Sequence, residues 1–491
     1  MTPVQILLIL VGYFGLLILI SWLTSRNSDS TSFYTGNKKS PWFLVAFGMI
    51  GASLSGVTFL SVPGWVANTH FGYMQTVMGY MLGYLVIAQV LLPLYYKLKL
   101  TSIYTYLEKR FGFYSYKTGA AYFLLSRIIG ASFRLYLVAG VLHLAIFEPF
   151  GWPYWATVAV TIVLIFTYTT KNGIKTVVYT DALQTFFLLA AVVLTIVYIV
   201  QDLDWTWAET FSNLSADPNS QIFHFKGNGN NVFWKQFLGG AFIALAMTGL
   251  DQDMMQKNLS ISNVKGAQRN IYVQMLLFLV VNIVFLSLGA LLYQYVEIKG
   301  IVGFEKSDQL FSTVALKNAS PLVGVFFIVG LVAAAYSSAD SALTALTTSF
   351  CVDFLGFERT KPTNLGTRRI VHIAFAVVLF ATILIFNWVN NDAVISGLFK
   401  AAGFTYGPLL GLFAFGILTK LQFTDKHVIA ISLLSIALTA GYYFGMPKII
   451  EGFKAGFELI IINGVITFAL LFLDSTINKT HIDDGEKPRE N

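Results

Sequence analysis

Cysteine, charge and clustered histidine are all scarce in this chain of 491 residues. The single cysteine, Cys351, excludes an intrachain disulfide and a cysteine-based metal site. The six histidines are scattered, and no pair has the H-x-x-x-H spacing of a zinc site. Charged residues make up only 12% of the chain and hydrophobic residues 56%. That balance excludes a soluble globular domain, because a soluble surface needs far more charge.

Long apolar stretches take the place of the missing charge. Each is about 20 residues long, enough for a helix to cross a bilayer, and none shows the alternation of a membrane β-barrel. The sequence therefore predicts an all-α integral membrane protein. Thirteen transmembrane helices are expected near residues 3–24, 42–67, 73–97, 116–146, 152–170, 175–201, 232–257, 270–297, 320–354, 367–388, 393–418, 426–445 and 455–474. The first stretch is too long for a cleaved signal peptide and is expected to remain as a helix.

Basic residues lie where membrane topology would place them, so the net charge of +7 does not indicate nucleic acid. They follow the odd-numbered stretches, as at Arg26, Lys109 and Lys171, whereas an intervening loop carries Asp204 and Glu209. This bias predicts an external N-terminus and a cytoplasmic tail over 476–491. The expected location is a cell membrane, the inner membrane of a bacterium.

Two of the predicted spans contain small, flexible residues at mid-depth. The second contains Gly51 and Gly56, followed by Pro63-Gly64, and the seventh contains Gly239-Gly240 and then the run 246–253. Unwound backbone is tolerated inside a membrane only where it lines a cavity. The glycines could instead allow close helix packing. A matched pair of broken spans favours an inverted-repeat transporter.

The ninth span carries a polar cluster without any basic residue. Ser337, Ser341, Thr344 and Thr348 share one helix face, with Asp340 beside them. Hydroxyl and carboxylate oxygens are the ligands that a small hard cation prefers. Such hydroxyls can also bond back to their own helix. The addition of a carboxylate favours a cation site.

Several motifs resemble, in order, those of the sodium:solute symporter family, whose members have the LeuT-type inverted-repeat fold. They cover nearly the whole chain and comprise Thr101 to Gly112, Gly173 to Gln184, Gly249-x-Asp251-Gln252 with Gln256-Lys257, Ser337 to Ser341, and Gly407-Pro408-Leu409-Leu410-Gly411. The resemblance implies one transport domain over 1–475. Within it, two five-helix repeats at 42–201 and 232–418 are preceded by one helix (3–24) and followed by two (426–474).

The resemblance also implies a sodium site between the second and ninth spans. Its ligands would be backbone carbonyls and hydroxyls of Gly51, Leu54, Ala334, Ser337 and Ser338. Some relatives bind a second sodium ion, which here would lie near Asp181, Ser337, Asp340 and Ser341. Asp181 could otherwise cap its helix or reach water at the membrane surface.

The substrate cavity of the family lies beside the sodium ion. The matching residues are Ser53, Ser55, Thr58, Gln75, Arg134, Met247 and Thr248. Thr58 and Met247 replace a glutamine and an aromatic gate typical of the sugar carriers, which argues against glucose or galactose. Arg127, Arg134 and Lys400 could bind a substrate anion, and each arginine could instead pair with Asp251 or Asp253.

The predicted function is sodium-coupled import of a small polar organic solute by alternating access in the lipid bilayer, with Na⁺ as coupling ion and no required oligomer. One alternative cargo is a small anion: a carboxylate such as sialic acid, a monocarboxylate, or an inorganic anion. A membrane sensor and a channel are alternatives of another class. An enzyme is not predicted, since no nucleophile–base pair is evident.

Overall fold

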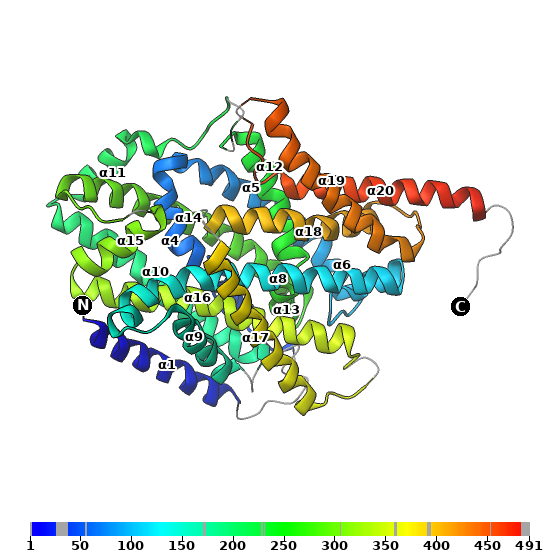
Figure 1. Ribbon diagram of the computed structural model, residues 1–491, viewed down its shortest axis with the longest axis horizontal. Helices are drawn as coiled ribbons and strands as arrows, with labels where there is room; N and C mark the ends of the chain where they lie inside the picture. Colours follow the sequence, from blue (N-terminus) through cyan, green and yellow to red (C-terminus); the bar gives the residue numbers. More distant parts are fainter. Residues whose placement is uncertain are drawn as a thin grey trace.

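The computed structural model describes residues 2–25, 38–54, 56–169, 173–226, 229, 231–304, 306–357, 361–389, 394–451 and 453–482. These residues form helices and loops, apart from one isolated bridge between Phe357 and Lys361. Most long helices run along the horizontal axis of Figure 1. The prediction of an all-α protein is confirmed.

The helices of the first half begin with α1 and end with α10. Their bounds are α1 Pro3–Ser25, α3 Trp42–Leu54, α4 Gly56–Thr69, α5 Tyr73–Val86, α6 Leu92–Lys97, α7 Thr105–Arg110, α8 Phe113–Leu142, α9 Tyr154–Thr169 and α10 Gly173–Asp202. A π-helical turn, Ile87–Leu91, joins α5 to α6, so the two form one long rod.

The helix α11 (Trp207–Ala216) separates the two halves of the chain. The helices of the second half are α12 Phe233–Ala244, α13 Gln252–Leu259, α14 Val264–Lys299, α15 Leu310–Thr313, α16 Pro321–Ser349, α17 Leu365–Val389, α18 Val394–Leu418, α19 Val428–Ile449 and α20 Leu459–Ile482. Ser320 caps α16 by accepting from the amide of Val323, with Pro321 in the first turn.

In the described part of the chain, ten helices are long and apolar enough to cross a membrane. The helices Trp42–Leu54 and Tyr154–Thr167 are also apolar but shorter. Each predicted stretch coincides with a helix or a helix pair, whereas the count of thirteen spans and the repeat boundaries stay predictions.

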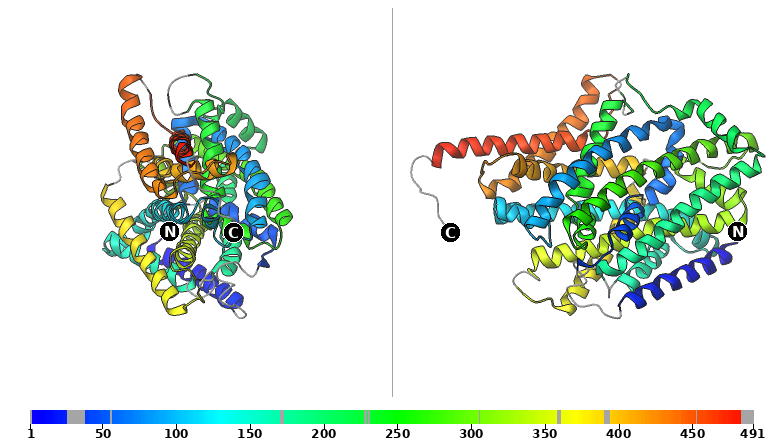
Figure 2. Two further views of the ribbon diagram at one scale, coloured as in Figure 1. Left: turned by 90° about the vertical axis from the view of Figure 1, so that its right-hand side faces the viewer. Right: turned by 180° about the vertical axis from the view of Figure 1, so that it is seen from behind.

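Burial separates a central helix from peripheral ones. In the most apolar part of Pro321–Phe354, 83% of the residues are buried, against 22% in Asp425–Ile449. The helix α16 packs against α10, α8 and α3. In contrast, α1 and the pair α19–α20 lie on opposite flanks of the bundle (Figure 2). The polar cluster of α16 is therefore enclosed by protein rather than lipid.

The predicted interruption of the seventh span is present. A π-helical turn over Leu245–Gly249 leads to extended backbone at Asp251, whose side chain then caps α13. Its Oδ1 accepts hydrogen bonds from the amides of Asp253 and Met254 at 2.9 and 3.2 Å. The predicted interruption of the second span falls at Ser55, which lies outside the described residues, and it stays a prediction.

Candidate functional site

The end of α3 and the middle of α16 meet inside the protein. The Ser338 hydroxyl donates to the carbonyl oxygen of Ala52 at 3.4 Å. An atom added as Cβ to Gly56 would lie 3.9 Å from Cα of Ala335. The structure thus brings together the two separated stretches predicted to hold sodium.

The chemistry of this junction fits a monovalent cation. Ser338 reaches the Ala52 carbonyl, so backbone oxygens of α3 face the hydroxyls of α16 at this junction. Ser337 and Ser338 are fully buried, and Ala334 is 1% exposed. Neutral backbone and hydroxyl oxygens in a dry interior suit sodium. The full predicted ligand set of Gly51, Leu54, Ala334, Ser337 and Ser338 therefore comes from two adjoining segments.

A buried carboxylate lies directly behind these hydroxyls. Ser337 donates to Asp181 Oδ1 at 2.6 Å, and Asp181 Oδ2 lies 2.7 Å from Nζ of Lys257 on α13. Because the Ser337 hydrogen points to Asp181, its oxygen lone pairs are left for a cation on the other side. Asp340 and Ser341, the other predicted ligands of a second sodium, are 0% and 1% exposed.

Close packing of α3 on α10 fixes the position of the α3 carbonyls. A Cβ on Gly51 would lie 2.2 Å from Oγ1 of Thr185, and one on Gly48 would lie 2.9 Å from Cβ of Asp181. Thr185 cannot turn away freely, because its hydroxyl donates to the Asp181 carbonyl at 2.8 Å. Small residues at this contact therefore hold the proposed ligands near Asp181.

We expect Gly51→Ala to lower both stability and sodium affinity, because overpacking a buried contact costs about 1–3 kcal/mol. Thermal unfolding at a series of sodium concentrations measures both effects. Gly140→Ala on α8 is the matched control, since no atom lies within 4 Å of a Cβ there. Thr185→Ala should partly rescue Gly51→Ala by removing the clashing oxygen. An unchanged sodium half-saturation in Gly51→Ala would contradict the assigned position of α3.

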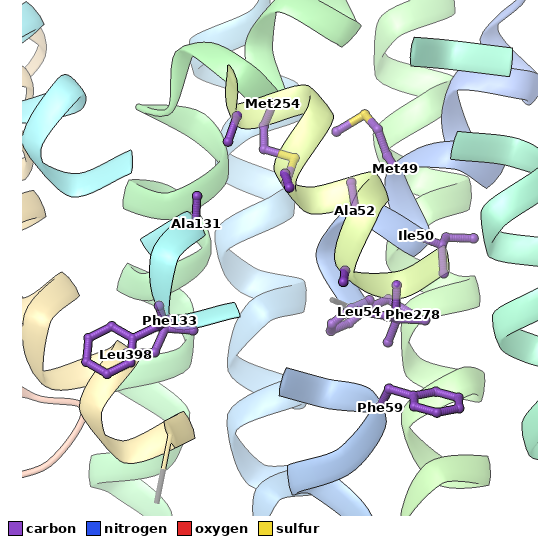
Figure 3. Close-up of a cluster of buried hydrophobic side chains, with 14 of the residues drawn as sticks. Met49, Ile50, Ala52, Leu54, Phe59, Ala131, Phe133, Met254, Phe278 and Leu398 are labelled. Carbon is purple, nitrogen blue, oxygen red and sulfur yellow. The ribbon is translucent and has the colours of Figure 1, made fainter. Parts of the chain in front are cut away.

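A pocket with an empty volume of about 600 Å³, part of it open to solvent, adjoins α3. Five predicted substrate residues line it, namely Ser53, Thr58, Arg134, Met247 and Thr248. The helices α3, α4, α8 and the π-helical turn after α12 contribute them. Figure 3 shows part of the apolar surroundings, with Leu54 and Phe59 on one side of the view and Phe133 and Leu398 on the other. The second and seventh predicted spans and α8 therefore line one pocket.

Aromatic side chains that were not among the predicted site residues line the same cavity. Tyr73, Tyr80 and Tyr84 face it from α5, and Phe278 faces it from α14. The hydroxyls of Tyr73 and Tyr80 lie 3.2 Å apart, and Gln274 donates to the Ser53 hydroxyl at 3.2 Å. The spacing of the tyrosines, i, i+7 and i+11, is a helical face signal that could have identified them.

The two arginines of α8 have different environments. Arg127 pairs with Asp253, and its Nη1 lies 3.9 Å from Asp251 Oδ2. Tyr406 also donates to that Asp251 oxygen, at 2.5 Å. Arg134 is 7% exposed and lines the cavity, and its Nε and Nη1 have no hydrogen-bond partner among the described residues. Arg127 is thus held by internal carboxylates, whereas Arg134 lines the cavity with two of its guanidinium nitrogens unpartnered among the described residues.

Other predicted residues lie elsewhere. Gln75 does not line the cavity; its amide nitrogen donates to the carbonyls of Gly72 and Asn231, both at 3.1 Å. Its oxygen accepts from the amide of His224, so Gln75 anchors the loop that leads into α12. Lys400 lines a neighbouring pocket beside Trp65. Ser55 lies outside the described residues.

A helical membrane protein with an interrupted span beside a central pocket has the architecture of a secondary transporter. Comparison with known proteins specifies the family: the chain belongs to the sodium:solute symporter family, whose model matches residues 33–426. The expected sodium-coupled symport, with Na⁺ as the coupling ion, is confirmed at the level of this family.

Individual relatives are similar to this chain in sequence, and one solved structure is similar to it in fold. The chain is 24% identical to the sodium/sialic acid symporter of Proteus mirabilis, over 97% of each chain. It is also 24% identical to human sodium-coupled monocarboxylate transporter 2, over 80% of this chain and 64% of the relative. Among solved structures, it resembles a substrate-bound, outward-open Na⁺-coupled sialic acid symporter with a TM-score of 0.82 and 20% identity, covering 96% of this chain and 98% of the other.

Proposed function

We propose that the protein imports a small organic anion bearing a carboxylate, together with sodium, into the cytoplasm. The observation that carries this proposal is the Arg134 guanidinium, which is buried against the cavity with two nitrogens lacking a partner. A buried cation without a partner is costly, and a carboxylate would supply both charge and hydrogen-bond acceptors. Of the solutes considered from the sequence, an anion therefore has the strongest support.

The relatives support the same chemistry. Their names specify sialic acid and monocarboxylates, both of which are carboxylates. The lining of the cavity, with three tyrosines and Phe278, Met247 and Leu398, accommodates an apolar body beside the charged group.

Sodium and solute are coupled through α3. The proposed ion site uses the carbonyls of Gly51 and Leu54, and Ser53 between them lines the cavity. Sodium would hold α3 against α16 and so complete the wall that the solute contacts. By linkage, each ligand then raises the affinity for the other. Loss of sodium to the cytoplasm would loosen this wall and release the solute.

The orientation proposed is an external N-terminus and a cytoplasmic C-terminal tail. The placement of the basic residues supports it. The beginning of α1 and the end of α20 also lie toward opposite ends of the long axis (Figure 1). A bacterial inner membrane is the proposed location.

Thermal stability of the purified chain with candidate solutes tests the proposal directly. We expect sialic acid or a small monocarboxylate to raise the unfolding temperature in sodium but not in choline, because ligands that bind only the folded state stabilise it. The amide of the same acid is the matched control and should have no effect. Stabilisation by neutral sugars, with none by any carboxylate, would contradict the assigned substrate class.

A further inference from the structure

Lys257 is a fully enclosed cation at the inner end of the sodium region. Its side chain is 1% exposed and its Nζ lies 2.7 Å from Asp181 Oδ2, which is itself 0% exposed. Every residue of the short helix α13 that carries it is buried. A charge so deep in the protein is tolerated only when it is paired.

Both carboxylate oxygens of Asp181 have a partner. One carboxylate oxygen accepts the Ser337 hydrogen at 2.6 Å, and the other meets the Lys257 ammonium. A sodium ion bound at the same carboxylate would lie within a few ångströms of that ammonium. Two like charges at one buried carboxylate repel strongly, since little water screens them.

We propose that the Lys257 ammonium is a tethered cation that takes the place of a second sodium ion at Asp181, so that the transporter binds one sodium per chain. The inference rests on the proposed sodium site between α3 and α16 and revises the predicted second site. The ion pair between Lys257 and Asp181 also connects α13, the inner half of the seventh span, to α10. Through Ser337, it is connected to the remaining sodium ion.

Two variants of the Lys257–Asp181 pair test whether the ammonium takes the place of a sodium ion. In Lys257→Gln, Asp181 loses its ammonium and becomes an unbalanced carboxylate facing Ser337. Sodium can then bind there. In the double variant Lys257→Gln/Asp181→Asn, both charges are absent, and an uncharged pair replaces the ion pair.

Equilibrium binding of radioactive sodium to the purified full-length chain measures the number of ions directly. The wild type should bind one sodium ion with no cooperativity. Lys257→Gln should gain a second ion, and the double variant should return to one. Sodium dependence of the unfolding temperature, measured on the same samples, verifies that each variant is folded.

Each outcome is decisive. Two sodium ions bound to the wild type would overturn the tethered-cation inference and leave the proposed function intact. No bound sodium would overturn the proposed site itself. A folded Lys257→Gln protein that still binds one ion would also overturn the inference. If Lys257→Gln does not fold, Lys257→Met, which keeps the length of the side chain, takes its place with the same expected count of two ions.

Discussion

Replacing Ser338 with alanine is expected to abolish sodium-stimulated solute uptake while the protein is still made and inserted. The Ser338 hydroxyl approaches the Ala52 carbonyl at 3.4 Å, where α16 meets the end of α3. Alanine removes one oxygen from the proposed ligand set and changes little else. Removing even an outer-shell partner lowers metal affinity by roughly 10–100-fold, so loss of a direct ligand should do at least as much.

The measurement is uptake into proteoliposomes as a function of sodium concentration. Ser432→Ala is a suitable control, because Ser432 is a buried serine on α19 whose hydroxyl donates to its own helix at Val428. That variant should retain the wild-type sodium response. Normal sodium dependence in Ser338→Ala would remove the physical basis for placing the coupling ion between α3 and α16.

The second large effect is expected at Arg134. Arg134→Gln should lower solute affinity by roughly a hundredfold, because removing one partner of a buried charge pair costs about 2–5 kcal/mol. Arg134→Lys should recover only part of this, since lysine retains the charge but not the planar pair of donors. Solute binding and uptake by the purified variants measure both effects.

A comparison with Arg127 separates an effect on solute binding from an effect on the stability of the fold. It pairs with Asp253, so Arg127→Gln leaves a buried carboxylate uncompensated and should destabilise the protein by about 3–5 kcal/mol. Arg134→Gln removes donors that lack internal partners and should leave the stability of the solute-free protein nearly unchanged. Equal loss of stability in the two variants, with solute binding retained in Arg134→Gln, would contradict the assignment.

Local sequence signals were sufficient for the broken seventh span. Glycines and other small residues predicted an interruption there, and the structure has extended backbone at Asp251. These signals succeed because unwinding depends on the residues at the break itself. Similarly, five of the predicted substrate residues line one cavity.

The sequence did not predict which side chains contact one another. Gln75 has a polar side chain in an apolar helix, yet it bonds to the loop before α12 rather than lining the cavity. The tyrosines of α5 could equally have been core residues, because a helical period specifies a shared face but not the helix opposite. The pairing of Lys257 with Asp181 joins two segments whose contact no local pattern encodes.

The sequence by itself determined that the chain lies in a membrane, where its seventh predicted span breaks, and which oxygen-rich segment can attract a cation. Those properties depend on apolar length, small residues and the high energy of polar groups in lipid. Only the tertiary structure decided that Arg127 is paired whereas Arg134 faces a cavity, and that Lys257 neutralises Asp181. The role of a buried charge depends on its nearest counter-charge, and helix packing alone brings such residues together.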